Sequence, residues 1–400
     1  MQQNILIVCD AFPPDFAPRI GNLCKYLSDK YNITVVTINP ISNLWTIQLE
    51  RKNLKLLRYK LLSYNEMDNT LHKIGDYLFS LGDRQLYHNV LKTIGNQNFD
   101  IVLCTACYIF PLLCAKKLSA HFGAPLCIDL RDIMEQNAKP IGFQKIRHFL
   151  KLQWLNIWRR NRILKSAQVV TTVSPWHVKT LKKFNNNIKL IYNGYDANIF
   201  KYQKTTTNYF TITYTGRLYD LSLRNPTIFL KAMQELCKNQ EFANSTRIEW
   251  FVSKQCIKQA TDLTLKYNLS AITNINQMIS AEQMPNLLNN SSVVLILTNL
   301  ATSNGPHGIM TTKFFEALGC ERPILCVRSD EDCLANAIEK TNAGIAARNV
   351  NEVKSFIISK FNEWQKNGFT HQDVCNKEFF TRQNQAKQFE EIFENCINKY

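Results

Sequence analysis

The sequence lacks a long apolar run. No stretch of its 400 residues approaches the ~18 or more consecutive apolar residues that a membrane-spanning helix needs. Its opening, MQQNILIVCD, has no basic lead, and the apolar run there is too short for the core of a signal peptide. We therefore expect a cytoplasmic protein that does not span a membrane.

Metal-binding and disulfide patterns are scarce as well. Cys104 and Cys107 form a C-x-x-C, but no second pair and no His pair at zinc spacing accompanies it. The thirteen cysteines mostly stand singly among apolar residues, as reduced core cysteines do, and their odd number argues against a disulfide framework. We expect no metal site, and we interpret the C-x-x-C as structural, with a redox role as the alternative.

Acidic residues are absent between Glu135 and Asp196, a stretch rich in Lys and Arg, and the net charge of the chain is +16. Such a block indicates an anionic partner: phosphate, nucleic acid or lipid headgroups. Within it, residues 145–165 combine cations with Trp, Phe and Ile, which is typical of a helix lying in a membrane interface. A helix that packs its apolar side on its own domain is the alternative. The predicted membrane-facing residues are Lys151, Trp154, Trp158, Arg159, Arg160 and Arg162.

What the sequence does contain is a repeated alternation of short apolar runs and helical periods, which predicts parallel sheets covered by helices. The runs ILIVCD, ITVVTI, DIVLCT, PLCIDL and QVVTTVS predict strands of a first sheet, and FTITYTG, RIEWFVS, SVVLILT and PILCV predict strands of a second. The fold class is thus α/β, with two Rossmann-like domains. We predict an N-terminal domain over 1–200, a linker at 201–208, a C-terminal domain over 209–376, and a final amphipathic helix over 377–400 that packs back onto the first domain.

Two motifs of the second half suit a phosphorylated ligand. In TGRLYDLSLRNP, Arg217 and Arg224 follow a strand end, where guanidinium groups can bind phosphate oxygens; solvated surface arginines are the alternative. In GIMTTKFFEALGCERP, Thr311 and Thr312 mark a helix start, whose N–H groups favour anions but which ordinary capping also explains. A carboxylate one turn into that helix, Glu316, is a candidate to bind both hydroxyls of a ribose, with an exposed helix residue as the alternative.

Five patches in order give the chain a resemblance to a known family: CDAFPPDFAPRIGNLCKYLSDKYNITVVT, APLCIDLRDIME, TVSPWHVKTLKK with IKLIYNGYD, YTGRLYDLSLRNP, and GIMTTKFFEALGCERPIL. They are similar to the retaining glycosyltransferases of the GT-B fold, family 4 (glycosyl transferase group 1), of the bacterial polysaccharide-biosynthesis type. The resemblance implies a nucleoside-diphosphate sugar of UDP or GDP type as substrate, with no separate cofactor and no metal.

The resemblance also implies roles for single residues. It gives donor binding to Arg217, Arg224, Thr311, Thr312, Lys313 and Glu316. It makes Arg131 and Asp132, which follow a strand, the candidates for the sugar-transfer site, with an Arg–Asp pair that locks a loop as the alternative. It gives phosphate or interdomain contacts to Arg19, Asn193 and Gly194, and we expect Gly194 to supply a turn with positive φ. Gly308 departs from the family, which has a glutamate there.

The predicted function is transfer of a sugar from a nucleotide sugar to a saccharide acceptor, in lipid-linked form, at the inner face of the membrane. A GT-B-fold sugar-nucleotide epimerase is one alternative, and a catalytically silent donor-binding subunit, suggested by Gly308, is another. A nucleic-acid-binding protein is disfavoured, because no zinc finger, RNA-binding signature or helix-turn-helix pattern is present.

Overall fold

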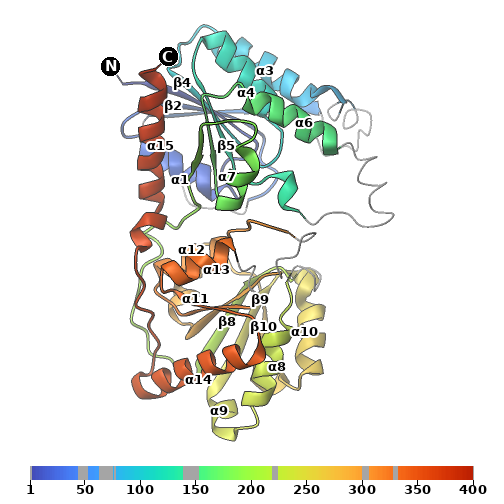
Figure 1. Cartoon of the computed structure of the whole chain (residues 1–400), viewed down its shortest axis with the longest axis vertical. Helices are drawn as coiled ribbons and strands as arrows, with labels where there is room; N and C mark the ends of the chain where they lie inside the picture. Colours follow the sequence, from blue (N-terminus) through green and yellow to red (C-terminus); the bar gives the residue numbers. More distant parts are fainter. Residues whose placement is uncertain are drawn as a thin grey trace. The chain divides into compact units, whose positions relative to one another are not determined.

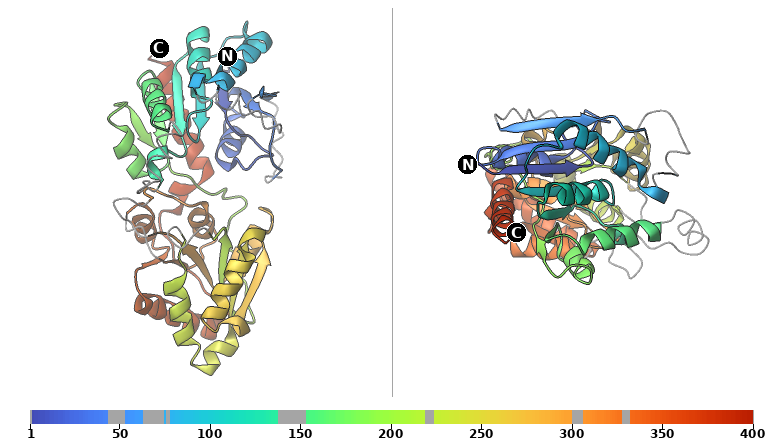
Figure 2. Two further views of the ribbon diagram at one scale, coloured as in Figure 1. Left: turned by 90° about the vertical axis from the view of Figure 1, so that its right-hand side faces the viewer. Right: turned by 90° about the horizontal axis from the view of Figure 1, so that it is seen from above.

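The computed structural model describes residues 2–43, 53–62, 75, 78–137, 153–218, 224–299, 306–327 and 332–399. The chain forms two compact units: the first contains residues 1–192 and 382–400, and the second contains residues 193–381. Each has a parallel sheet with helices on both faces (Figures 1 and 2). The predicted fold class is confirmed.

Within the described residues, the sheet of the first unit has seven strands in the order β3-β2-β1-β4-β5-β6-β7. Residues of β1 alternate between its two faces: Leu6 and Val8 enter one hydrophobic core, and Ile5 and Ile7 enter another. This period of two, with both faces buried, explains why the central strands are almost wholly apolar. The strands are β1 (Asn4–Cys9), β2 (Asn32–Ile38), β3 (Leu54–Tyr59), β4 (Ile101–Ala106), β5 (Leu126–Leu130), β6 (Val169–Thr172) and β7 (Ile188–Leu190).

Helices cover these two cores. One core includes residues of α3 (Leu81–Ile94), α4 (Leu112–Phe122) and α6 (Gln153–Leu164), and the other includes residues of α1 (Pro18–Leu27) and α15 (Arg382–Ile397). Among the residues that the structure describes, this unit also has the 3-10 helix η2 (Met134–Gln136) and the helix α7 (Pro175–Leu181). Gly123 ends α4 with φ 60°, the left-handed conformation in which glycine commonly ends a helix.

The described part of the second sheet has six strands in the order β10-β9-β8-β11-β12-β13. They are β8 (Phe210–Gly216), β9 (Thr246–Val252), β10 (Thr273–Gln277), β11 (Val293–Leu297), β12 (Ile324–Val327) and β13 (Gly344–Ala347). The accompanying helices are α8 (Thr227–Leu236), α9 (Gln240–Ser245), α10 (Ile257–Lys266), α11 (Met284–Asn289), α12 (Thr312–Gly319), α13 (Cys333–Lys340) and α14 (Val350–Asn367), with short 3-10 helices η3 (Lys254–Cys256), η4 (Ser270–Ile272) and η5 (Lys377–Phe380).

The linker expected at 201–208 belongs to the second unit instead. Its backbone is held there: the N–H of Gln203 donates to the side chain of Asn289 (3.0 Å), and the N–H of Thr207 donates to the carbonyl of Gly368 (2.9 Å). Buried Arg322 also donates to the Gln203 carbonyl (2.6 Å). The polar segment 201–208 is therefore part of the second unit, and the N-terminal segment of the first unit ends earlier, at Tyr192.

The single C-terminal helix expected over 377–400 is divided. Phe380, in η5, packs against Phe314 and Phe315 of the second unit, whereas Phe389 and Phe393, in α15, lie in a core of the first. The two helical segments are separated at Thr381, which is extended. The apolar residues near helical spacing thus belong to two different cores.

Candidate functional site

The candidate donor site lies at the carboxyl edge of the second sheet. β8 and β11 are neighbours there although helices and β9 and β10 separate them in sequence, so their ends form the switch point where ligands bind in open α/β sheets. β8 ends at Gly216, with φ 126°, and Arg224 donates from Nη1 to the carbonyl of Leu297, the last residue of β11, at 3.3 Å. Arg224 is thereby fixed at the switch point.

Lys313 lies directly against the backbone of Gly216. A Cβ added to that glycine would lie 2.7 Å from Cε of Lys313 and 2.8 Å from its Nζ. Burial, followed by the repulsion of Arg224, lowers the pKa of Lys313 to about 8, and Glu316 opposes this shift. Lys313, Arg224 and Glu316 therefore form one electrostatic cluster beside Gly216, with two basic groups and one carboxylate.

The cluster stands at the start of α12. Thr311 is the N-cap residue with extended backbone, and Thr312 is the first helical residue, so the helix begins where the sequence predicts. The Thr311 hydroxyl makes no capping hydrogen bond. Since α12 buries Phe314 and Phe315 against the sheet, its N-terminus, with the positive end of its dipole, is held at this edge.

Two predicted donor-side positions behave differently. The side chain of Arg217 is exposed, and no interaction among the described residues joins it to Lys313. Gly308 has φ 68°, a left-handed conformation that disfavours a residue with a Cβ. The missing glutamate thus coincides with a backbone that suits glycine.

The first unit carries a second polar cluster at the carboxyl edge of its sheet. Arg131, just after β5, donates from Nη2 to Asp10, just after β1. The other carboxylate oxygen of Asp10 accepts from the N–H of Cys107, after β4, at 3.3 Å. Nε of Arg131 is buried without a hydrogen-bond partner. Asp10 was not predicted, although its position after the first strand, at the β1–β4 switch point, could have indicated it.

Asp132 belongs to a separate chain of hydrogen bonds. Its Oδ1 accepts from Nε2 of Gln136 at 2.8 Å, and Oε1 of Gln136 lies 2.7 Å from Nε2 of His177. Burial lowers the pKa of His177 to about 4. Neither Gln136 nor His177 was predicted. His177 stands in the patch TVSPWHVKTLKK, but its link to Asp132 runs between segments that are distant in sequence.

Arg19 is buried and pairs with groups of the first unit. Its Nε and Nη2 donate to the two oxygens of Asp129 at 2.9 and 2.8 Å, its Nη1 donates to the carbonyl of Tyr192 at 2.9 Å, and only 4% of its surface is exposed. The guanidinium is thus engaged within the first unit, and its phosphate contact stays a prediction. Asn193 and Gly194 open the second unit, and Gly194 lacks the expected positive φ.

The predicted membrane-facing helix is confirmed as a helix from Gln153, and Lys151 lies outside the described residues. Trp154 and Trp158 are 49% and 51% exposed. Arg160 departs from the prediction: it is fully buried and donates to both oxygens of Glu135, at 2.8 and 2.6 Å, so it faces the protein interior.

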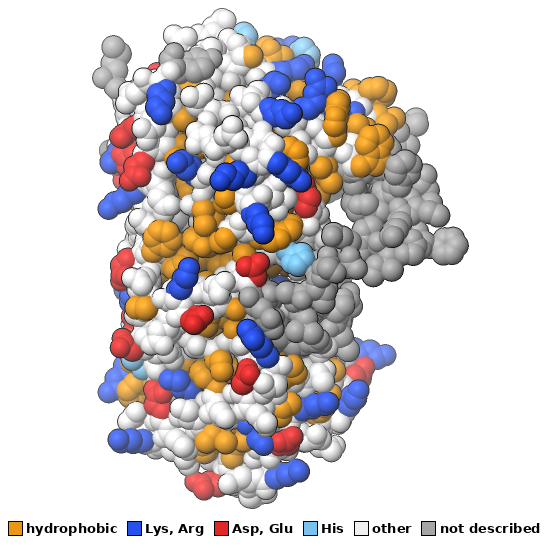
Figure 3. Space-filling view, viewed as in Figure 1, with side chains coloured by type: hydrophobic (Ala, Val, Ile, Leu, Met, Phe, Trp, Pro, Cys, Tyr) orange, Lys and Arg blue, Asp and Glu red, His pale blue; other side chains and the backbone are white. Residues whose placement is uncertain are grey.

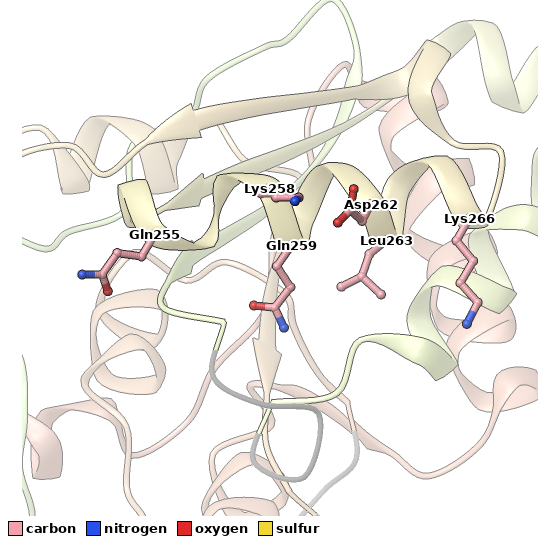
Figure 4. Close-up of a pocket in the computed structure, with 6 residues that line it drawn as sticks. All are labelled: Gln255, Lys258, Gln259, Asp262, Leu263 and Lys266. Carbon is pink, nitrogen blue, oxygen red and sulfur yellow. The ribbon is translucent and has the colours of Figure 1, made fainter.

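One further surface hollow lies along α10 and holds none of the predicted residues. It has a volume of about 420 Å³ and is lined by Gln255, Lys258, Gln259, Asp262, Leu263 and Lys266, all from one segment (Figure 4). Among the described residues, no group of three or more His, Cys, Asp or Glu side chains is placed to hold a metal ion. No helix in that part of the chain is both long and apolar enough to cross a membrane.

Comparison with known proteins shows which solved structures this fold resembles. The sequence matches no protein-family model and no curated protein. Its structure is similar to sucrose-phosphate synthase of Thermosynechococcus elongatus (TM-score 0.69, 14% identity, 100% of both chains covered). It is also similar to HepE of Anabaena, crystallised with UDP and glucose (TM-score 0.64, 16% identity, covering 98% of this chain and 100% of HepE). The chain has the GT-B fold.

The GT-B fold is shared by proteins of more than one activity. A Listeria monocytogenes protein described as a UDP-N-acetylglucosamine 2-epimerase matches with a TM-score of 0.60 and 12% identity, covering 100% of this chain and 98% of that one. At such identities the likeness defines the fold, and the activity has to be argued from the residues.

Proposed function

We propose that this chain is a retaining glycosyltransferase that takes a sugar from a nucleoside-diphosphate sugar of UDP or GDP type. The observation that carries the proposal is the cluster of Lys313, Arg224 and Glu316 beside Gly216, at the N-terminus of α12. Two cations and a helix N-terminus provide donors and positive charge for a diphosphate, and Glu316 supplies a carboxylate for the ribose. Crystallisation of HepE with UDP and with UDP-glucose supports this donor class.

In the proposed reaction, the bond between the anomeric carbon and the diphosphate oxygen breaks, and the electron pair stays on the diphosphate. The oxygen of an acceptor hydroxyl forms the new bond on the same face of the anomeric carbon, and its proton passes to the departing diphosphate. Lys313 and Arg224 stabilise the charge that develops there, which is the role that a metal ion has in other transferases. Arg131 and Asp132 are proposed to contact the sugar substrates, and Arg217 and Thr312 the donor phosphates. The acceptor is proposed to be a saccharide, in lipid-linked form.

Thermal unfolding with UDP, GDP and their sugars tests the donor class, because a ligand that binds only the folded chain raises its stability. Lys313→Met and Glu316→Gln should lose most of the stabilisation by UDP. Lys258→Met, an exposed lysine on α10, is the matched control and should keep it. Full stabilisation of both site variants would contradict the assignment.

We also propose that the first unit contacts an anionic membrane surface through α6, at the cytoplasmic face. Figure 3 shows hydrophobic side chains beside Lys and Arg over this region. Trp154 and Trp158 are half-exposed, and Arg162 lies over the Trp158 ring at 4.8 Å. Exposed Trp rings flanked by cations suit the headgroup layer of a bilayer.

Flotation with vesicles of phosphatidylglycerol tests this surface. The double variant Trp158→Ser, Arg162→Gln should remain with the soluble fraction, whereas Lys258→Gln should float as the wild type does. Flotation of the double variant would contradict the proposed contact of α6 with the membrane. Arg160 is left intact, because its burial makes any loss of binding uninterpretable.

Epimerisation is the second candidate function, since a protein described as an epimerase shares the fold. Incubation of UDP-N-acetylglucosamine without an acceptor distinguishes the two reactions. Without an acceptor, an isomerised nucleotide sugar with no net UDP release supports the epimerase. Release of UDP with transfer of the sugar, seen only once a saccharide acceptor is added, supports the transferase. Binding of UDP with neither outcome, for every sugar tried, identifies a silent donor-binding subunit.

A further inference from the structure

The hydrogen-bond chain that ends on Asp132 runs from the surface of the first unit into its interior. Asp132 follows β5, Gln136 is in η2, and His177 is in α7 with only 1% of its surface exposed. Nδ1 of His177 lies 3.0 Å from Oγ1 of Thr172, at the end of β6. Residues 132–136 are thereby joined to residues 172–177 by one linear series of hydrogen bonds.

The directions of these hydrogen bonds are fixed by chemistry. The Gln136 amide donates to Oδ1 of Asp132 through Nε2, because its oxygen would be repelled by the carboxylate. The amide oxygen must then accept, so Nε2 of His177 carries a hydrogen. Because burial keeps the ring neutral near pH 7, with a pKa of about 4, Nδ1 is then unprotonated. The Thr172 hydroxyl lies 3.0 Å from Nδ1 and also 3.0 Å from the Leu130 carbonyl oxygen, so these two acceptors compete for its single hydrogen. From Asp132 to His177 the chain has one consistent orientation.

The charged groups around His177 do not alter this state. Asp132 and Glu135 favour the charged ring and Arg160 disfavours it, and burial outweighs all three. At the other end of the chain, Oδ2 of Asp132 accepts no hydrogen bond from any described residue, while Oδ1 is held. One oxygen of a half-buried carboxylate is thus fixed and the other is left for a ligand.

We propose that Gln136 and His177 are positioning residues that hold Asp132 so that its Oδ2 can accept a hydrogen bond from a sugar hydroxyl. This inference rests on the proposed function, in which Asp132 contacts a sugar substrate. In this proposal neither residue contacts the substrate: His177 orients the Gln136 amide, and that amide holds Asp132. A misplaced group of this kind lowers the rate of the bound complex by about 10- to 100-fold, and has little effect on nucleotide binding by the second unit.

Two substitutions of the same histidine give the sharpest test. His177→Gln places an amide N–H near the position of Nε2 and keeps the donor to Gln136, whereas His177→Asn is shorter and loses it. For the sugar nucleotide that the wild type turns over fastest, kcat of UDP or GDP release should fall about 10- to 100-fold in His177→Asn and in Gln136→Leu. It should return to within about threefold of wild type in His177→Gln, with the donor KM unchanged throughout.

Equal kcat in His177→Asn and His177→Gln, or a change confined to KM, overturns the inference. His88→Gln, an exposed histidine on α3, is the matched control and should behave as wild type. A wild-type protein that releases no nucleotide from any donor contradicts the proposed function instead. Nitrogen-15 NMR of labelled histidines needs no substrate: His177 should show the Nε2–H tautomer at pH 7, and an Nδ1–H tautomer overturns the inference.

Discussion

At the scale of single residues, the carboxyl edges of the two sheets differ in how their cations are paired. In the first unit the cations are matched, since Arg19 pairs with Asp129 and Arg131 pairs with Asp10. In the second unit, Lys313 is half-buried near Arg224, and its pKa is lowered to about 8. Burying this ammonium beside another cation costs stability that a bound anion would return.

The pH dependence of Lys313 follows from that cost. Its pKa is 10.5 when unperturbed and about 8 in the fold, so between these values the unfolded chain binds more protons than the folded one. The unliganded protein should therefore gain about 1–3 kcal/mol of stability as the pH rises from 8 to 10. Its affinity for UDP should fall over the same range, because the ammonium loses its charge. Calorimetry between pH 8 and pH 10 measures the change in stability and the change in UDP affinity, and Lys313→Met should abolish both changes.

Gly216 gives a second prediction at this scale. Its φ of 126° and the closeness of Lys313 leave no room for a methyl group. Gly216→Ala should destabilise the second unit by about 1–3 kcal/mol, from backbone strain, and weaken UDP binding by displacing Lys313. The control Gly123→Ala also has positive φ but open space around it, so it should lose stability without losing UDP affinity. Equal UDP affinity in Gly216→Ala and wild type would show that Lys313 does not bind the diphosphate.

At the scale of elements, the sequence predicted the central strands and missed the edge strands. β3, β7, β10 and β13 were not predicted, and all four lie at sheet edges. An edge strand has one neighbouring strand instead of two and is less buried, so polar residues are tolerated there. The sequence of β10 is TNINQ and that of β3 is LKLLRY. The donor helix α12 was predicted, together with its start, because caps and apolar period are local signals. The Gln136–His177 chain and the Arg19–Asp129 pair depend on contacts between distant segments, which local patterns do not encode.

The helix α6 shows how similar residues in one element differ in role. Arg160 is buried against Glu135, while Arg162, two positions later, is exposed. Arg160→Leu should destabilise the first unit by about 3–5 kcal/mol, because it leaves the Glu135 carboxylate without its partner. Arg162→Leu should change stability by less than about 0.5 kcal/mol. Denaturant titration measures both, and equal losses would contradict the pairing.

At the scale of the whole molecule, the chain leaves the first unit at Tyr192 and returns at Arg382. The second unit is therefore one continuous segment, whereas the first is made of two. A fragment of residues 193–381 should fold alone with a cooperative transition and bind UDP with the affinity of the full chain. Circular dichroism and calorimetry of this fragment check both points. Fragment 1–192 should unfold cooperatively only when a peptide of residues 382–399 is added, and cooperative unfolding without the peptide would contradict the division.

This division also sets an order of events during synthesis. A ribosome makes residues 193–381 completely before it reaches Phe389 and Phe393, the α15 side chains that lie in the same core as Ile5 and Ile7. The second unit can thus fold while one face of the first sheet still lacks the helix α15 that covers it. The first unit is translated first for most of its length, yet it is the last to bury its apolar core. A nascent chain that stalls between the two stages exposes an apolar sheet face to chaperones.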